Sequence, residues 1–255
     1  MSAGAEPELR LDLVRLAAVG STNDLIREAA EAGAAAGRMI VAEQQTAGRG
    51  RHGRIWQSPP GNLYASLLLR PTRPMGELAS LSLVVGLVLA EAVEALGCPV
   101  RAELKWPNDV LLGDGKLAGI LLEGSSADGR RCDWLIVGMG INVRAAPGVD
   151  VGYPTATLAA AGLPDVQPGD LLGALCPRLT RGLAAWERAG FAPFRDRWLA
   201  RARGLGGAIE LRLGQRTVQG TLEGIDMGGA LLVRGADGVL EHHAAGELVL
   251  PALAG

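Results

Sequence analysis

Residues 45–56 read Gln-Thr-Ala-Gly-Arg-Gly-Arg-His-Gly-Arg-Ile-Trp and lie between two apolar runs, 39–44 and 63–69, that are typical of strands. The glycines leave the backbone free to wrap around a ligand, and the N–H groups and guanidiniums together suit a phosphate or a carboxylate. A solvated basic loop, or an RNA contact of the Arg/Gly type, is the alternative. No Gly-Lys-Ser/Thr follows, so the segment is not a Walker loop.

A second candidate is the pair of segments Lys105-Trp106-Pro107-Asn108-Asp109 and Gly115-Lys116-Leu117-Ala118-Gly119. The apolar strand expected at 119–123 reads as buried, so we expect Lys116 to emerge at its edge, close to a ligand pocket. The alternative is a lysine whose aliphatic stem covers surface while its ammonium stays in water.

A third candidate is Gly138-Met139-Gly140-Ile141-Asn142-Val143, within a strand expected at 134–143. Val143 stands where a dinucleotide fingerprint has its third glycine, and no helix N-terminus follows, which disfavours a Rossmann site. Asn142 at the strand end can hydrogen-bond a ligand phosphate. The alternative is that the glycines only allow close packing.

The remaining patterns indicate a mixture of helices and strands. A helix is expected from Ser21, since Ser21 and Asp24 have capping-box spacing, to Gly33. The apolar stretch Leu81–Ala90 is too short for a membrane span and reads as the start of a core helix that runs to about Leu96 and stops at Gly97. Further strands are expected at 101–106 and 119–123, as a hairpin over Asp114-Gly115, and further helices at 171–189 and 194–203.

The pattern changes after the glycine-rich segment 204–207. Short strands are expected at 209–213, 217–225, 230–234 and 240–250. So many short strands in so short a segment favour a small barrel appended to a larger domain. The expected division is a domain at residues 1–204 followed by a second one at 205–255.

Composition limits the class of protein. Of 255 residues, 48% are hydrophobic, and the net charge of −2 makes any anion-binding role depend on local charge. Cys98, Cys132 and Cys176 form no Cys-x-x-Cys or His/Cys cluster, which favours a reduced, cytoplasmic protein without a zinc site. The charged segment 1–16 contains no signal-peptide core. No protein metal site, nucleic-acid partner or membrane partner is expected.

Taken in order, the motifs resemble those of the biotin–protein ligase family. The matching segments are Ser21–Asn23, Gln45–Trp56, Lys105–Asp109, Gly115–Leu121 and Gly138–Val143. The resemblance covers residues 12–250 and implies an α+β fold. It implies a class II aminoacyl-tRNA synthetase/biotin ligase-like catalytic domain, with a mixed sheet and helices, followed by an SH3-like β-barrel. The implied activity is ATP-dependent conversion of biotin to biotinyl-5′-AMP, then biotin transfer to a lysine of a biotin carboxyl carrier protein.

The resemblance also assigns residues to the implied site. For biotin it implies Ser21, Thr22, Asn23, Gln45, Gly48, Arg49, Arg51, Lys116 and Gly119. For ATP, which is expected with Mg²⁺, and for the adenylate it implies Arg49, Arg51, Arg54, Trp56, Lys116 and Asn142. The implied catalytic residues are Lys116 and Arg51, which act on the reacting phosphate, and Asp109, which positions or deprotonates the acceptor lysine.

Two features depart from the family pattern. Some members have arginine where His52 stands, so retention of the adenylate is expected to differ modestly. Only 20 residues precede Ser21, too few for the helix-turn-helix of members that act as repressors, so the chain resembles the form without a DNA-binding domain. Family members include monomers and homodimers, and the sequence does not decide between them.

Three alternatives stay open. A lipoate or octanoate ligase would use the same chemistry, but the polar set Ser21–Asn23 and Gln45 suits a ureido ring better than an aliphatic chain. An RNA-binding protein is disfavoured by the sequence pI of about 6.0 and by an aromatic content of 4%. A biotin sensor without catalysis would have no need of Lys116.

Overall fold

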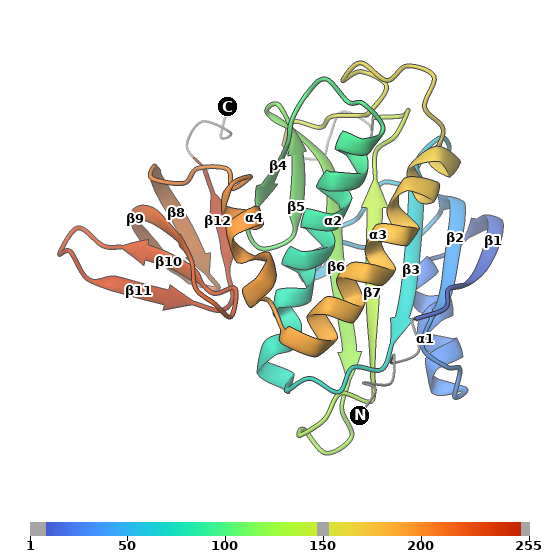
Figure 1. The fold of residues 1–255 in the computed structure, drawn as a ribbon, viewed down its shortest axis with the longest axis horizontal. Helices are drawn as coiled ribbons and strands as arrows, with labels where there is room; N and C mark the ends of the chain where they lie inside the picture. The colour runs from blue at the N-terminus through green and yellow to red at the C-terminus, as the bar shows by residue number, and fades with distance from the viewer. Residues whose placement is uncertain (1–8, 147–152, 251–255) are drawn as a thin grey trace, which may run out of the picture.

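The computed structural model describes residues 9–146 and 153–250. Residues 1–8 and 147–152 of the first predicted domain and residues 251–255 of the second lie outside the described residues. The described chain forms two sheets (Figure 1). The main sheet has the order β1-β2-β3-β7-β6-β5-β4. Its strands are β1 (Asp12–Val19), β2 (Arg38–Gln45), β3 (Leu63–Leu69), β4 (Ala102–Lys105), β5 (Asp109–Leu112), β6 (Gly115–Ser125) and β7 (Trp134–Ile141). β1 pairs with β2 in parallel and the other pairs are antiparallel, so the sheet is mixed.

Helices cover the two faces of the main sheet unequally. α2 (Leu81–Ala95) and α3 (Pro168–Ala189) pack together on one face, and α1 (Thr22–Glu31) lies on the other (Figure 1). Successive residues of a strand point to opposite faces of the sheet, so Leu67 packs on the α2 side and Leu68 on the α1 side. α1 packs against β2, β3 and β7. On the same face of the sheet, β4, β5 and β6 are therefore covered by other segments.

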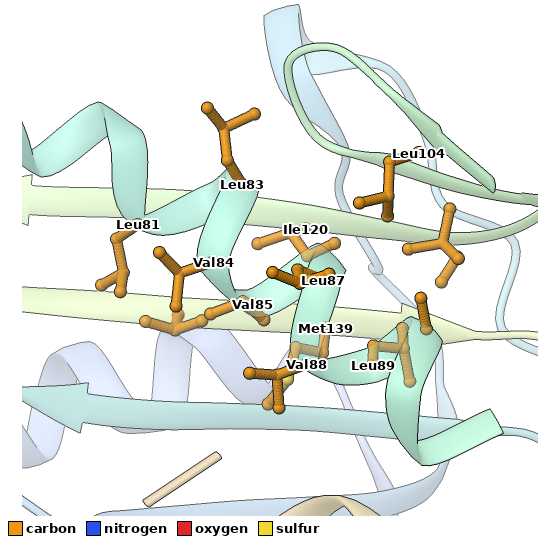
Figure 2. Packing of buried hydrophobic residues seen from close by; sticks show 14 of the residues in the cluster. Leu81, Leu83, Val84, Val85, Leu87, Val88, Leu89, Leu104, Ile120 and Met139 are labelled. Carbon is orange, nitrogen blue, oxygen red and sulfur yellow. The ribbon is translucent and has the colours of Figure 1, made fainter. Parts of the chain in front are cut away.

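α2 is the core helix of the protein. From Leu83 to Ala90 it is apolar on every side, so this part has no stripe suited to water and must be covered all round. Figure 2 shows its leucines and valines packed over Ile120 and Met139 of the main sheet. The predicted helix and its stop at Gly97, which has a φ of +79°, are confirmed. By length and hydropathy Met75–Ala95 could cross a membrane, but 78% of the window tested is buried inside the protein.

The C-terminal sheet is antiparallel throughout and has the order β11-β10-β9-β8-β12. Its strands are β8 (Ala208–Leu213), β9 (Arg216–Ile225), β10 (Leu231–Arg234), β11 (Leu240–His243) and β12 (Glu247–Val249). The predicted fold class, a mixed sheet with helices followed by a small β unit, is confirmed. Closure of this unit into a barrel and the boundary after residue 204 stay predictions.

Three predictions about strands and helices were wrong, and one strand was missed. The run predicted as one strand at 240–250 is two, because the chain turns at Gly246 and sends β11 and β12 to opposite edges of the sheet. The predicted hairpin between 101–106 and 119–123 does not form, because β4 pairs with β5, which in turn pairs with β6. The four-residue run of β5 is too short to be recognised from its sequence. β1 was missed because it is a largely exposed edge strand without clear alternation. The helix predicted at 194–203 is shorter in the structure, where α4 spans Arg195–Leu199.

The two sheets share one core. The Trp106 indole Nε1 donates to the carbonyl oxygen of Gly229 over 3.1 Å, and Arg195 Nε donates to that of Ile225 over 2.8 Å. One buried apolar cluster continues from α2 and the main sheet to Ile225 and Leu231 of the C-terminal sheet. This packing fixes β12 beside the uncovered end of the α1 face.

Candidate active site

One pocket lies on the α1 face of the main sheet, where α1 does not cover the strands. The segment 46–61 between β2 and β3 is the arginine-rich loop. The wall of the pocket is formed by the start of α1, by residues 49–52 and 54–56 of this loop, and by β12 of the C-terminal sheet. Its floor comes from β4, β5, β6 and β7. The three candidate segments of the sequence, widely spaced along the chain, therefore meet in one place.

The floor is a row of residues across four strands. The register places Lys105 opposite Asp109, Asp109 opposite Gly119, and Gly119 opposite Gly140, and opposed residues of antiparallel strands share a face. The two glycines make room for the Trp56 indole. A methyl group at Gly140 would overlap the ring, and one at Gly119 would lie 3.2 Å from it. Gly140 of β7 and Gly119 of β6 thus form the seat of an aromatic ring.

Lys116 brings a positive charge to the middle of this floor. Its Nζ lies 2.7 Å from Asp109 Oδ1, and each of the two side chains is 17% exposed. The same Nζ lies 5.4 Å from the centroid of the Trp56 ring and 5.0 Å from that of Tyr153. Aromatic faces attract a cation, so three side chains hold the ammonium in place.

Hydrogen bonds link the start of α1 to the end of β2. Gln45 Oε1 accepts from the Thr22 N–H at 2.8 Å and from the Thr22 hydroxyl at 3.0 Å, while Gln45 Nε2 donates to Ser58 Oγ at 3.1 Å. Ser21 is the N-cap of α1, but its hydroxyl does not close the predicted capping box. That prediction was wrong because Asp24, the other member of the box, binds Arg49 instead.

The Asn23 amide has a fixed orientation. Its Nδ2 donates to Glu123 Oε2 at 2.5 Å, and its Oδ1 lies 2.5 Å from the Ser66 hydroxyl, which donates to it. A carboxylate only accepts, so Glu123 decides which way round the amide lies. A methyl group at Gly138 would overlap Asn23, so this side chain is pressed against β7.

The Arg49 guanidinium closes the polar end of the pocket from the loop side. It donates to both oxygens of Asp24, at 2.6 and 2.7 Å, and it lies 3.7 Å from Glu123. The hydrogen bond from Arg49 holds the pKa of Asp24 below its usual value. Arg27 binds the same two carboxylates, at 2.8 and 3.1 Å. The base of the loop is therefore tied to α1 and β6.

The tip of the loop is tied to the C-terminal sheet. Arg51 donates to the carbonyl oxygen of Gly246 at 3.2 and 3.3 Å, and Arg54 donates to both carboxylate oxygens of Glu247 at 2.6 and 2.7 Å. The hydrogen bond from Arg54 lowers the pKa of Glu247, and burial lowers the pKa of Arg51. Between them, His52 adopts left-handed backbone angles, φ 57° and ψ 31°, which a non-glycine residue adopts at some cost.

The described residues contain no group of three or more His, Cys, Asp or Glu side chains placed to hold a metal ion. The two carboxylates that reach the pocket floor and rim are both engaged, Asp109 with Lys116 and Glu247 with Arg54. These side chains therefore do not fit a resident metal ion.

Comparison with known proteins identifies the family. A model described as the Biotin/lipoate A/B protein ligase family matches residues 17–142, and one described as the Biotin protein ligase C terminal domain matches residues 204–250. The biotin–[acetyl-CoA-carboxylase] ligase of Paracoccus denitrificans is 42% identical over 218 residues, 84% of this chain and 87% of that protein. The chain belongs to the biotin–protein ligase family.

Two further similar proteins support this assignment. The bifunctional ligase/repressor BirA of Escherichia coli (strain K12) is 37% identical over 217 residues, which span 84% of this chain and 66% of BirA. The solved structure of the biotin protein ligase from Aquifex aeolicus in complex with biotin and ATP superposes with a TM-score of 0.80. That match is 32% identical and covers 93% of this chain and 97% of that one.

Most residues predicted from the ligase motifs meet in the pocket. Its lining includes Ser21, Thr22, Asn23, Gln45, Arg49, Arg51, Arg54, Trp56, Asp109, Lys116 and Gly119. Gly48 and Asn142 do not line it. Gly48 packs closely against Trp56 and Ser58, and Asn142 is buried and donates through Nδ2 to the carbonyl oxygen of Lys116 at 3.2 Å. Asn142 therefore supports the strand that carries Lys116, and its predicted contact with the nucleotide stays a prediction.

Several residues that line or support this ligase pocket are not predictable from the sequence motifs. Ser66 and Glu123 orient Asn23, and Glu247 binds Arg54 across 193 residues of sequence. Nothing local marks them, because each is recognisable only through a partner far along the chain. Lys105 is different, because it stands in the quoted motif 105–109 and lines the pocket.

Proposed function

We propose that this biotin–protein ligase activates biotin with ATP to biotinyl-5′-AMP and transfers the biotinyl group to a lysine of a biotin carboxyl carrier protein. One observation carries the proposal. A single pocket joins an ordered set of uncharged hydrogen-bonding groups, at the start of α1, to a fixed lysine and loop arginines at its other end.

The polar end suits the ureido ring of biotin. Such a ring needs both donors and acceptors in a pocket that is otherwise apolar. Thr22, Asn23 and Gln45 offer a hydroxyl and two amides, and their mutual hydrogen bonds order them before the ligand arrives. The same groups would leave the aliphatic tail of octanoate without matching partners, which favours biotin over that acid.

The charged end suits the activation step. A carboxylate brought within about 4 Å of a phosphate is repelled by about 4 kcal/mol at an effective dielectric constant of 20. Lys116 lies where it offsets this repulsion and stabilises the charge that develops on the α-phosphate. A carboxylate oxygen of biotin attacks the α-phosphorus, the bond from that phosphorus to the bridging oxygen breaks, and pyrophosphate leaves with the electron pair.

The transfer step needs a neutral amine. The ε-amine of the acceptor lysine attacks the acyl carbon, the bond from that carbon to the AMP oxygen breaks, and AMP leaves with the electron pair. The attacking nitrogen must also lose a proton. Asp109 is the carboxylate on the pocket floor, so we assign it to position the incoming ammonium and to accept that proton.

We propose that Mg²⁺ is bound to ATP as its counter-ion. Mg²⁺ in ATP-using enzymes is commonly held by substrate phosphates and water rather than by an all-protein site. We also propose that the protein acts in the cytoplasm, as a monomer or homodimer, and without nucleic acid. The three unpaired cysteines support a reducing compartment.

The test is carrier labelling followed by mass spectrometry. The protein is incubated with MgATP, a biotin carboxyl carrier domain, and either biotin, lipoate or octanoate. We expect a biotinyl adduct on the acceptor lysine and none on a carrier whose acceptor lysine is replaced by arginine. Lipoyl or octanoyl labelling in preference to biotin would move the protein to a different branch of the family.

A further inference from the structure

Lys105 is a pocket lysine to which the reaction described so far gives no role. It ends β4 at the edge of the floor, directly opposite Asp109 in the strand register. Among the residues that the structure describes, no hydrogen bond or ion pair involves its ammonium group, whereas Lys116 is paired with Asp109. Its side chain is half-buried and its ammonium faces the pocket without a protein partner, so it is free to pair with an anionic ligand that enters the pocket.

The composition of the chain makes this lysine more notable. Of 25 basic residues, 23 are arginines and only Lys105 and Lys116 are lysines. Both lysines line the same pocket. A lysine ammonium is a compact point charge with rotatable donors, which suits a phosphate chain that moves during the reaction better than a rigid guanidinium fork does.

The strand order of the floor places Lys105 far from the biotin end of the pocket. Asn23, at the biotin end, lies against Gly138 of β7, and the row then runs from Gly140 through Gly119 and Asp109 to Lys105. Neighbouring strands are about 4.8 Å apart, so Lys105 is the most distant member from the biotin end. Phosphoryl transfer places the attacking and leaving oxygens roughly in line. A carboxylate that arrives from the β7 side therefore drives the leaving group toward β4.

We infer that Lys105 binds the β- and γ-phosphates of ATP and holds pyrophosphate as it leaves. This inference rests on the proposed function and deepens it. The ammonium gives up no proton, since its charge offsets the negative charge that accumulates on pyrophosphate when the bond to the α-phosphorus breaks. Burial lowers the pKa of Lys105, and a bound polyphosphate would oppose that shift by stabilising the ammonium form.

The first test compares the two half-reactions in Lys105→Met and Lys105→Arg. For Lys105→Met we expect kcat/KM for ATP in adenylation to fall roughly 10- to 100-fold, as for loss of a hydrogen bond to a charged group, and pyrophosphate inhibition to weaken similarly. Biotin affinity, and transfer from supplied biotinyl-5′-AMP to the carrier, should stay at wild-type values. Lys105→Arg, which keeps the charge, should recover most of the adenylation rate.

The matched control is Arg101→Met. It removes a cation just before the same strand, where Arg101 contacts the carbonyl oxygen of Ala200 and does not line the pocket. Adenylation by this variant should equal that of the wild type. Unchanged pyrophosphate inhibition in Lys105→Met, or an equal loss of adenylation and transfer, would overturn the inference.

The second test uses the wild-type protein and does not depend on a variant that folds. Acetic anhydride acetylates neutral amines, and with two lysines in the chain each site is resolved by mass spectrometry. We expect pyrophosphate, at concentrations that inhibit exchange, to slow acetylation of Lys105 relative to that of a free lysine derivative added as an internal standard. Equal rates with and without pyrophosphate would contradict the inference, even if biotin ligation itself proved correct.

Discussion

Lys116 is held by neighbours that leave little freedom to its ammonium. Asp109 pairs with it, Trp56 and Tyr153 present their rings to it, and Asn142 donates to its backbone carbonyl. A cation fixed in this way needs no reorganisation when charge develops on the phosphate. The role proposed for Lys116 rests on this position.

Replacement of Lys116 by alanine tests that role. Adenylation should fall by roughly 10²- to 10³-fold or more, since a preorganised charge at the reacting phosphate is lost. The fold should survive, because the strand around Lys116 is held by backbone hydrogen bonds and the side chain is not part of the apolar core. Exchange kinetics and a thermal melt measure the two effects. Turnover near the wild-type rate would remove Lys116 from its assigned role.

Gly140→Ala tests the seat of the Trp56 indole. The added methyl group would overlap the ring, so either the indole or β7 must move, which costs about 1–3 kcal/mol of unfolding free energy. Gly173→Ala in α3 is the control, because nothing lies within 4 Å of its added methyl group. Of the two variants, Gly140→Ala alone should unfold at a lower urea concentration than the wild type and bind ATP with lower affinity. Equal stability of the two variants would show that the indole is not seated on Gly140.

At the scale of elements, the arginine-rich loop is tied at both ends by ion pairs. Its base is bound through Arg49 to Asp24 of α1, and its tip through Arg54 to Glu247 of β12. Bidentate pairs fix direction as well as distance, so they hold the loop over the pocket. Both carboxylates have pKa values below their usual range, which makes the two ties sensitive to acid.

Glu247→Gln gives the sign of that dependence. The lowered pKa means that the pair stabilises the fold above the unfolded-state pKa of 4.5, and that this contribution is lost as pH falls through the lower folded value. At pH 7 the free energy of unfolding of the wild type should exceed that of Glu247→Gln by at most about 1 kcal/mol, because the Arg54 side chain is 58% exposed. Urea unfolding at several pH values should show this difference shrinking in acid. A difference that grows as pH falls would contradict the pairing.

The sequence predicted elements where one local pattern decided them. β3 and α2 are continuous apolar runs, and both were predicted within one residue of their observed ends. Elements decided by their surroundings were missed or misjoined. β1 gains its place only by pairing with β2, and the hairpin partner of β4 depends on the four residues of β5. Local periodicity carries no record of such pairings.

At the scale of the whole molecule, the site joins the two sheets. The tie between Arg54 and Glu247 and the hydrogen bond from Trp106 to Gly229 both cross from the main sheet to the C-terminal sheet. The motifs predicted which residues around the loop and β6 belong together. They could not predict Glu247, Ser66 or Glu123, because those neighbours exist only once the chain has folded.

The shared core predicts one unfolding transition. Apolar side chains of α2, the main sheet and the C-terminal sheet form a single buried cluster, so neither part can unfold without exposing the other. Far-ultraviolet circular dichroism, which reports secondary structure, and Trp106 fluorescence, read in a variant with the other four tryptophans replaced by phenylalanine, should have the same urea midpoint. Two separate midpoints would show that the C-terminal sheet is an independent unit.

The central claim is that this pocket joins a biotin carboxylate to AMP. Exchange of labelled pyrophosphate into ATP, measured with biotin, lipoate, octanoate or no acid, tests it most directly, because exchange requires formation and reversal of the acyl-adenylate. Exchange should depend on biotin and should be lost in Lys116→Ala. Exchange supported by lipoate or octanoate and not by biotin, or no exchange with any acid by folded protein supplied with Mg²⁺, would contradict it.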